Sequence, residues 1–113
     1  MDISFEGVGQ VAATFQAAGA VRPGQAVTVT ANNTVGLGTD GGALCGVVLG
    51  GVRGGAAAVQ IGGVVQVGYS GETDPAVGWQ GLACDGKGGV KAAAGGVKCL
   101  VLAVDGGSAV IKL

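Results

Sequence analysis

The chain has 113 residues, a mass of 10.6 kDa and a formal net charge of −1. This length fits one domain, and the near-neutral charge offers no electrostatic attraction for nucleic acid or an anionic membrane, so we expect neither as a partner. The sequence contains no histidine, the commonest general base and metal ligand. Together with the lack of a recognisable acid–base pair, this favours a binding or structural protein without a cofactor over an enzyme.

The N-terminal segment predicts an arm. It carries two acids and no basic residue before Arg22, whereas a secretory signal begins with a basic region, so we expect no such signal. Ile3 and Phe5 form an apolar tip before the glycine-rich residues 7–9. We predict residues 1–20 as an N-terminal arm or edge segment and residues 21–113 as a compact β domain. The residues predicted to contact a partner are Met1, Asp2, Ile3, Ser4 and Phe5.

Alternation of apolar and polar residues dominates the chain in place of helical periodicity, which predicts short strands. Val11, Ala13 and Phe15 alternate and favour a strand inside the first segment. Further strands are predicted at residues 26–31, 35–37, 44–49, 57–69, 79–84, 90–93, 97–104 and 109–113. Between them lie glycine-rich turns, such as the hairpin loop of residues 85–89. The predicted fold is all-β: a small single-domain β-barrel or β-sandwich.

The most regular alternation lies in residues 57–69. The odd positions are mainly apolar and are predicted to share one buried face, while the even positions are mainly small or polar. Two glycines, Gly62 and Gly63, lie at the centre of this segment, where they predict a bulge or a bend.

Two glycine motifs invite a functional interpretation that their surroundings disfavour. Gly36-Leu-Gly-Thr-Asp-Gly41 matches the dinucleotide fingerprint, but a β segment, not a helix, is predicted after it. Gly81 to Lys87 nearly matches a phosphate-binding loop, but position 88 lacks the required hydroxyl. Lys87 also resembles the hairpin lysine of lipoyl or biotinyl carrier domains, although its neighbours differ from those families. A hairpin tip with a solvated lysine is the favoured interpretation.

The three cysteines, Cys45, Cys84 and Cys99, are odd in number and include no Cys-x-x-Cys pair. Buried thiols are therefore favoured over a disulfide or a metal site.

The order of elements resembles the small capsid decoration (cement) proteins of tailed bacteriophages. The resemblance covers about residues 20–113 and lies in the pattern: a Pro-Gly-Gln turn before Val-Thr-Val-Thr, the strand around Ala-Val-Gln-Ile-Gly-Gly-Val-Val-Gln-Val, a Trp79 strand with an Asp-Gly hairpin, and a final valine-rich hairpin. It implies a β domain on the exterior of the virion that is made in the host cytoplasm. It also implies binding to the major capsid protein through an N-terminal arm, often as trimers.

The unusual composition also favours association. Glycine makes up 26 of the 113 residues and charged residues only 12%. Each glycine inside a strand costs about 0.5–1 kcal/mol relative to alanine, and the apolar residues are mainly small. We therefore expect the chain to self-associate, with a trimer favoured. The alternatives are a β-rich carbohydrate- or receptor-binding module, for which Trp79 and Tyr69 are the available aromatics but alternate into apolar faces, and a carrier domain bearing Lys87.

Overall fold

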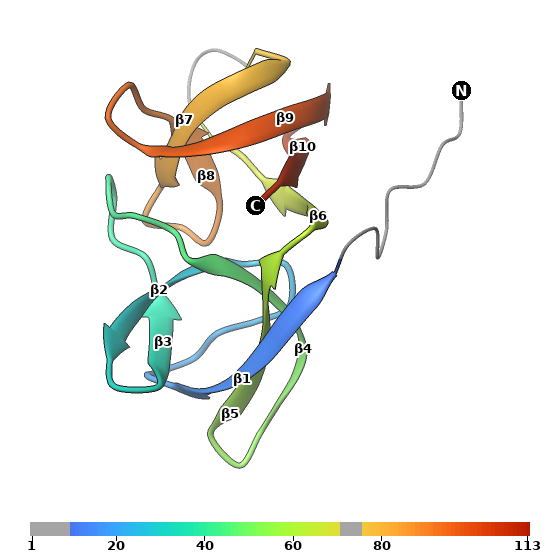
Figure 1. Cartoon of the computed structure of the whole chain (residues 1–113). Helices are drawn as coiled ribbons and strands as arrows, with labels where there is room; N and C mark the ends of the chain where they lie inside the picture. The colour runs from blue at the N-terminus through green and yellow to red at the C-terminus, as the bar shows by residue number, and fades with distance from the viewer. Residues whose placement is uncertain (1–9, 71–75) are drawn as a thin grey trace.

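The computed structural model describes residues 10–70 and 76–113, without the side chains of residues 51–53, and contains only strands as regular elements there (Figure 1). The predicted all-β fold is thereby confirmed. The strands are β1 (Val11–Ala17), β2 (Ala26–Ala31), β3 (Thr34–Leu37), β4 (Gly46–Arg53), β5 (Ala56–Gly62), β6 (Val64–Gly68), β7 (Gly78–Cys84), β8 (Val90–Ala92), β9 (Val97–Asp105) and β10 (Ser108–Lys112).

The first five strands form a closed barrel in the order β1-β3-β2-β4-β5. β1 closes it, pairing parallel with β3 and antiparallel with β5. The strand predicted from the alternation of Val11, Ala13 and Phe15 is confirmed, and Phe15 packs against the buried residues of the barrel. Residues 11–17, which lie within the predicted arm or edge segment, thus have a strand partner on each side. Closure leaves no free edge in this sheet.

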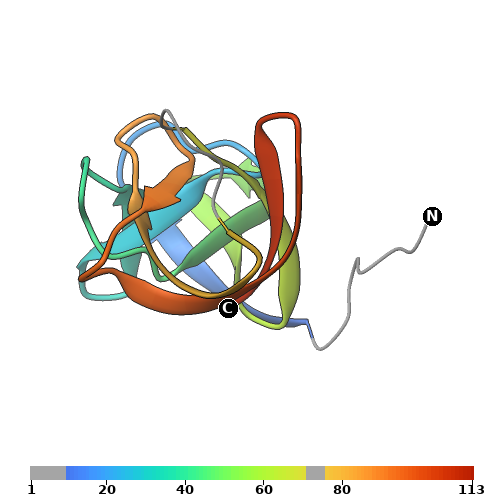
Figure 2. The same ribbon diagram turned by 90° about the horizontal axis from the view of Figure 1, so that it is seen from above.

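The last five strands form a second sheet in the order β6-β10-β9-β7-β8. A parallel bridge between Tyr69 and Val90 joins the two ends of this sheet, and the Ser70 amide donates a hydrogen bond of 2.9 Å to the Val90 carbonyl. The second sheet therefore curls around its own core and stacks on the barrel, as Figures 1 and 2 show from the side and from above.

The chain passes from the barrel to the second sheet at Gly63, between β5 and β6. Gly63 has a φ of +86°, a conformation that side-chain-bearing residues rarely adopt, and the predicted bend is confirmed. The prediction that the odd positions of residues 57–69 share one buried face is wrong. Ala57, Val59 and Val67 are buried as expected, but Gln60 is buried, Ile61 is 40% exposed and Val64 is buried, because the chain bends between β5 and β6 and the alternation does not continue through the bend.

Valine and alanine dominate the buried residues, which form two clusters. The barrel cluster contains Val21, Val27, Val35, Val48, Ala57 and Val59. The other cluster lies inside the second sheet, with Leu82 and Ile111 as its largest fully buried side chains. Ala26, Leu44 and Val47 of the barrel half belong to that second cluster. The two halves therefore share a continuous apolar contact, and burial of these residues stabilises both together.

Candidate partner-binding surface

The predicted partner-contacting residues, Met1 to Phe5, lie outside the described residues. The described chain starts at Gln10, next to the first strand of the barrel. Val11 pairs with Gly62, and the Leu113 amide donates a hydrogen bond of 2.9 Å to the Gly63 carbonyl. The described chain therefore begins beside the end of the C-terminal strand β10, at the junction of the two halves.

Trp79, the one tryptophan of the chain, is 64% exposed on β7. The expectation that it alternates into an apolar face is wrong. Leu82 and Cys84 are the residues of β7 that point into the core, and the two-residue period of a strand then turns Trp79 to the opposite face. Counting back from these two residues would have found its exposure in the sequence. Tyr69, by contrast, is partly buried and packs against the core of the second sheet.

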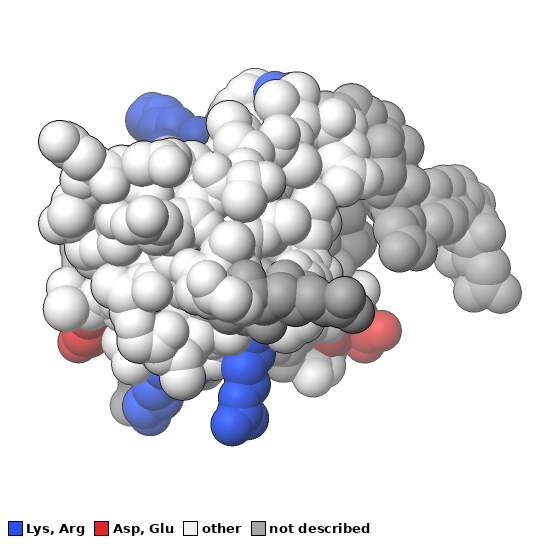
Figure 3. Space-filling view, turned by 90° about the horizontal axis from the view of Figure 1, so that it is seen from below, with Lys and Arg blue, Asp and Glu red and all other residues white. Residues whose placement is uncertain are grey.

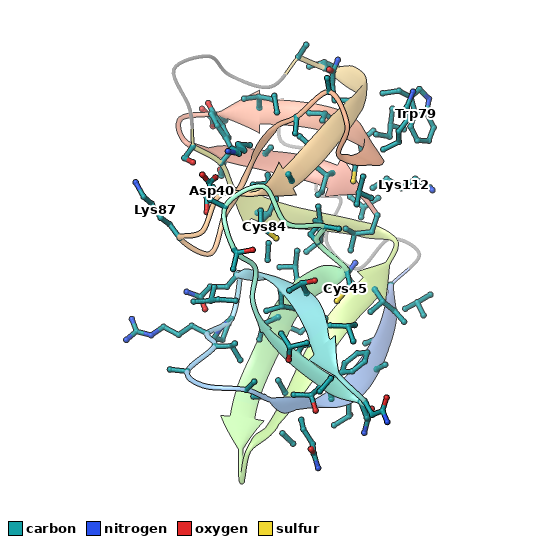
Figure 4. All side chains as sticks on the ribbon, turned by 90° about the vertical axis from the view of Figure 1, so that its left-hand side faces the viewer. Asp40, Cys45, Trp79, Cys84, Lys87 and Lys112 are labelled. Atoms are coloured by element: carbon teal, nitrogen blue, oxygen red, sulfur yellow. The ribbon has the colours of Figure 1, made fainter. Side chains whose placement is uncertain are left out.

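Strand register aligns Trp79 with two residues on the outer surface of the second sheet. Trp79 pairs with Leu100 of β9, and Leu100 pairs with Lys112 of β10. Residues directly opposite each other project to the same side of a sheet. Lys98 lies two residues before Leu100 and so projects to that side as well. We call Trp79, Lys98, Leu100 and Lys112 the Trp79 face; Figure 4 shows Trp79 and Lys112 projecting from the same side of the molecule.

The Trp79 face combines apolar area with positive charge. Lys98 and Lys112 are exposed, and neither forms an ion pair with another described residue. The ion pair that the described residues do form joins Lys91 of β8 to Asp40 in the loop after β3, at 2.6 Å. Elsewhere charge is sparse: in the view from below (Figure 3), most of the described surface is uncharged, and the charged side chains lie near its rim. The exposed lysines are therefore free to meet an acidic partner.

In the hairpin tip around Lys87, the carboxylate of Asp85 occupies the place that a bound phosphate takes in a phosphate-binding loop. The Asp85 carboxylate accepts hydrogen bonds from the backbone amides of Lys87 at 2.7 Å and Gly89 at 3.0 Å. Burial opposes its ionisation, but hydrogen bonds from Lys87, the Ser70 side chain and Gly89 outweigh this effect and lower the pKa of Asp85. The amides that would cradle a phosphate are thus occupied by an anion of the chain itself. The Lys87 side chain points away from the molecule (Figure 4).

The Gly36–Gly41 motif serves packing. β3 ends at Leu37, and a turn, not a helix, follows. A Cβ atom at Gly38 would collide with the sulfur of Cys84, so the glycine permits close approach of this loop to β7. A dinucleotide site needs a helix N-terminus directed at the pyrophosphate, and this segment does not supply one.

All three thiols are free. Cys84 and Cys99 are each only 1% exposed and Cys45 is half-buried. Burial raises the pKa of each thiol above its usual value, most directly by removing water from the thiolate. Over residues 10–70 and 76–113, no group of three or more His, Cys, Asp or Glu side chains is placed to hold a metal ion. In the same residues there is no helix that could cross a membrane.

Comparison of the sequence with protein-family models and with curated proteins gives no match in either case.

Proposed function

We propose that the chain is a structural virion protein that binds the outer surface of a tailed-phage capsid and stabilises the shell. It acts by non-enzymatic contact with the major capsid protein. The observation that carries this proposal is the Trp79 face: an exposed tryptophan beside a half-buried leucine, flanked by two unpaired lysines, on a rigid sheet. Exposed aromatic side chains contribute strongly to protein interfaces, and a rigid sheet presents them at little entropic cost.

Further support comes from the sparse charge and from the pattern that the sequence shares with decoration proteins. A surface with few charges can pack closely against a repetitive lattice, where many weak contacts add up to stable binding. In this proposal residues 1–5 and the Trp79 face supply the contacts, and self-association into trimers, on the virion exterior, repeats them. A trimer would present three Trp79 faces to neighbouring capsid subunits.

Co-sedimentation tests the proposal. The genes that flank this one are first searched for a major capsid protein; shells assembled from that protein are then centrifuged with wild-type protein, with Trp79→Ala, and with the control Val29→Ala. Val29 is also exposed, at 54%, but lies on the barrel. We expect saturable binding that Trp79→Ala weakens by roughly tenfold or more, as for a central interface aromatic, while Val29→Ala binds like wild type. Absence of saturable binding, or the absence of a neighbouring capsid gene, would refute the proposal.

The exposure of Trp79 also supports a second candidate function, a carbohydrate- or receptor-binding module, because a flat aromatic side chain can stack on a sugar ring. A glycan array distinguishes the two functions. Binding to defined sugars that Trp79→Ala abolishes, together with no binding to shells, would favour the carbohydrate module over the capsid protein.

A further inference from the structure

We propose that the acidic, apolar N-terminal segment Asp2–Glu6 folds back onto the Trp79 face of its own chain in the free protein. This inference goes beyond the proposed function, since it concerns the chain before it meets any shell. The two surfaces proposed above to contact a capsid would then cover each other until a shell separates them.

The side chains of the segment complement those of the Trp79 face. In an extended segment Ile3 and Phe5 project to one side, and the acids Asp2 and Glu6 project to the other side, one before and one after this apolar pair. Ile3 and Phe5 can therefore pack on apolar Trp79 and Leu100, while the long side chains of Lys98 and Lys112 reach past the edges of the segment toward its acids. The Cα atoms of the two acids are four residue steps apart, about 13 Å in an extended chain, and strand geometry places the two lysine Cα atoms about 8 Å apart. Flexible lysine side chains bridge the difference.

The segment is joined to the described chain at Gln10, close to the end of β10. Val11 pairs with Gly62, and the amide of Leu113, the residue after Lys112, donates a hydrogen bond to the carbonyl of Gly63. In Figure 4 the start of β1 lies on the same side of the molecule as the labelled Lys112 and Trp79. From Gln10, four to eight extended residues reach about 13–28 Å, whereas the row from Lys112 to Trp79 is only two strand spacings, or about 10 Å, wide.

A segment of the same chain has an advantage over a segment of a second copy. Tethering a segment this close to its binding surface gives an effective concentration in the millimolar range, well above that of a second copy in dilute solution. Contact with Ile3 and Phe5 removes apolar area of Trp79 and Leu100 from water, and the two ion pairs add specificity more than stability. The segment of the same chain is therefore the favoured occupant.

Fluorescence of the single tryptophan reports directly on this contact. Acrylamide quenching is measured on the full chain and on a variant lacking residues 1–6, whose ten strands remain because β1 begins at Val11. Circular dichroism checks that this variant is folded. We expect deletion to shift the Trp79 emission to the red and to raise the quenching constant by roughly twofold or more, because contact with Ile3 and Phe5 shields the indole. Equal quenching in the two proteins would overturn the proposal.

Charge-reversal variants test the proposed ion pairs between the segment and the Trp79 face. The double variant Lys98→Glu with Lys112→Glu should raise the quenching constant of Trp79 as the deletion does. Adding Asp2→Lys with Glu6→Lys should restore the attraction and so restore the protection of Trp79 from acrylamide. Lys87→Glu on the distant hairpin, and Glu72→Gln with Asp74→Asn, serve as controls and should leave quenching unchanged. If the charge-reversed set does not restore protection, the pairing is refuted.

The dependence on protein concentration distinguishes contact with the segment of the same chain from contact with the segment of a second copy. Protection that stays constant on hundredfold dilution supports the same-chain contact, whereas protection that disappears on dilution would assign the segment to a second copy and overturn the proposal. Because the assay contains no capsid shells, it can fail while capsid binding stands, and capsid binding can fail while protection stands.

Discussion

The side-chain amide of Gln60 donates a hydrogen bond of 3.0 Å to the backbone carbonyl of Val64, across the bend that joins the barrel to the second sheet. The same nitrogen donates to the Gly62 carbonyl, also at 3.0 Å. Gln60 is 2% exposed, the one polar side chain buried among the described residues. A single buried amide thus donates to two backbone carbonyls at the bend, and its bond to Val64 is buried while its bond to Gly62 is partly buried.

Replacing Gln60 with leucine should therefore destabilise the whole domain. The variant keeps the apolar bulk but leaves the carbonyls of Gly62 and Val64 without a donor, which should cost about 2–3 kcal/mol in free energy of unfolding. Urea denaturation measures the change. Gln66→Leu is the matched control, since Gln66 is exposed and bonds only to the Ser108 hydroxyl among the contacts seen; it should change stability by less than about 0.5 kcal/mol. Equal losses in the two variants would contradict this role of Gln60.

Alanine at Gly38 should overpack the contact between the β3 loop and β7. The added methyl group meets the Cys84 sulfur, so we expect a loss of about 2–3 kcal/mol in thermal or urea unfolding. Gly95→Ala, where nothing lies within 4 Å of the added methyl, is the control and should be nearly neutral. In the double variant Gly38→Ala with Cys84→Ala, the smaller side chain at position 84 leaves room for the added methyl group. The double variant should therefore lose less stability than the sum of the losses of the two single variants. Strict additivity would argue against the contact.

Asp85 should contribute a stability that acid removes. The pKa of this carboxyl is lower in the folded chain than in the unfolded one, so its contribution is present above the unfolded value of about 3.9 and is lost as pH falls through the folded pKa. The difference in unfolding free energy between wild type and Asp85→Ala should be largest near pH 7, at about 1 kcal/mol, and should shrink below about pH 4. A difference that is independent of pH would show that the charge of Asp85 plays no part.

The thiols should differ in reactivity in the native protein. Cys84 and Cys99 are buried, whereas Cys45 is partly accessible, so a thiol reagent should modify one cysteine per chain before unfolding and three after it. Because burial also raises the pKa of Cys45, its reaction should speed up as pH rises toward 9. Intact-mass measurement counts the modified thiols, and Cys45→Ala should abolish the native-state reaction. Rapid modification of Cys84 or Cys99 without unfolding would contradict the packing of this core.

Local patterns predicted where the strands and turns lie. The predicted strand at residues 26–31 coincides with β2, and the loop at residues 85–89 joins β7 to β8 as expected. Alternation and turn chemistry involve residues that are close in the chain, which is why a sequence reveals them. The strand predicted at residues 44–49 instead begins at Gly46 and runs to Arg53, because pairing with β5 extends it beyond its apolar residues.

The sequence by itself determined that this chain is all-β, rich in tight turns and poor in the residues of catalysis. Only the tertiary structure decided that β1 closes a barrel between β3 and β5, that Gln60 is buried while Ile61 is not, and that Trp79, Leu100 and Lys112 align on one surface. These relations join residues that are distant in the chain, and strand pairing, not any local preference, selects which face of each strand is covered.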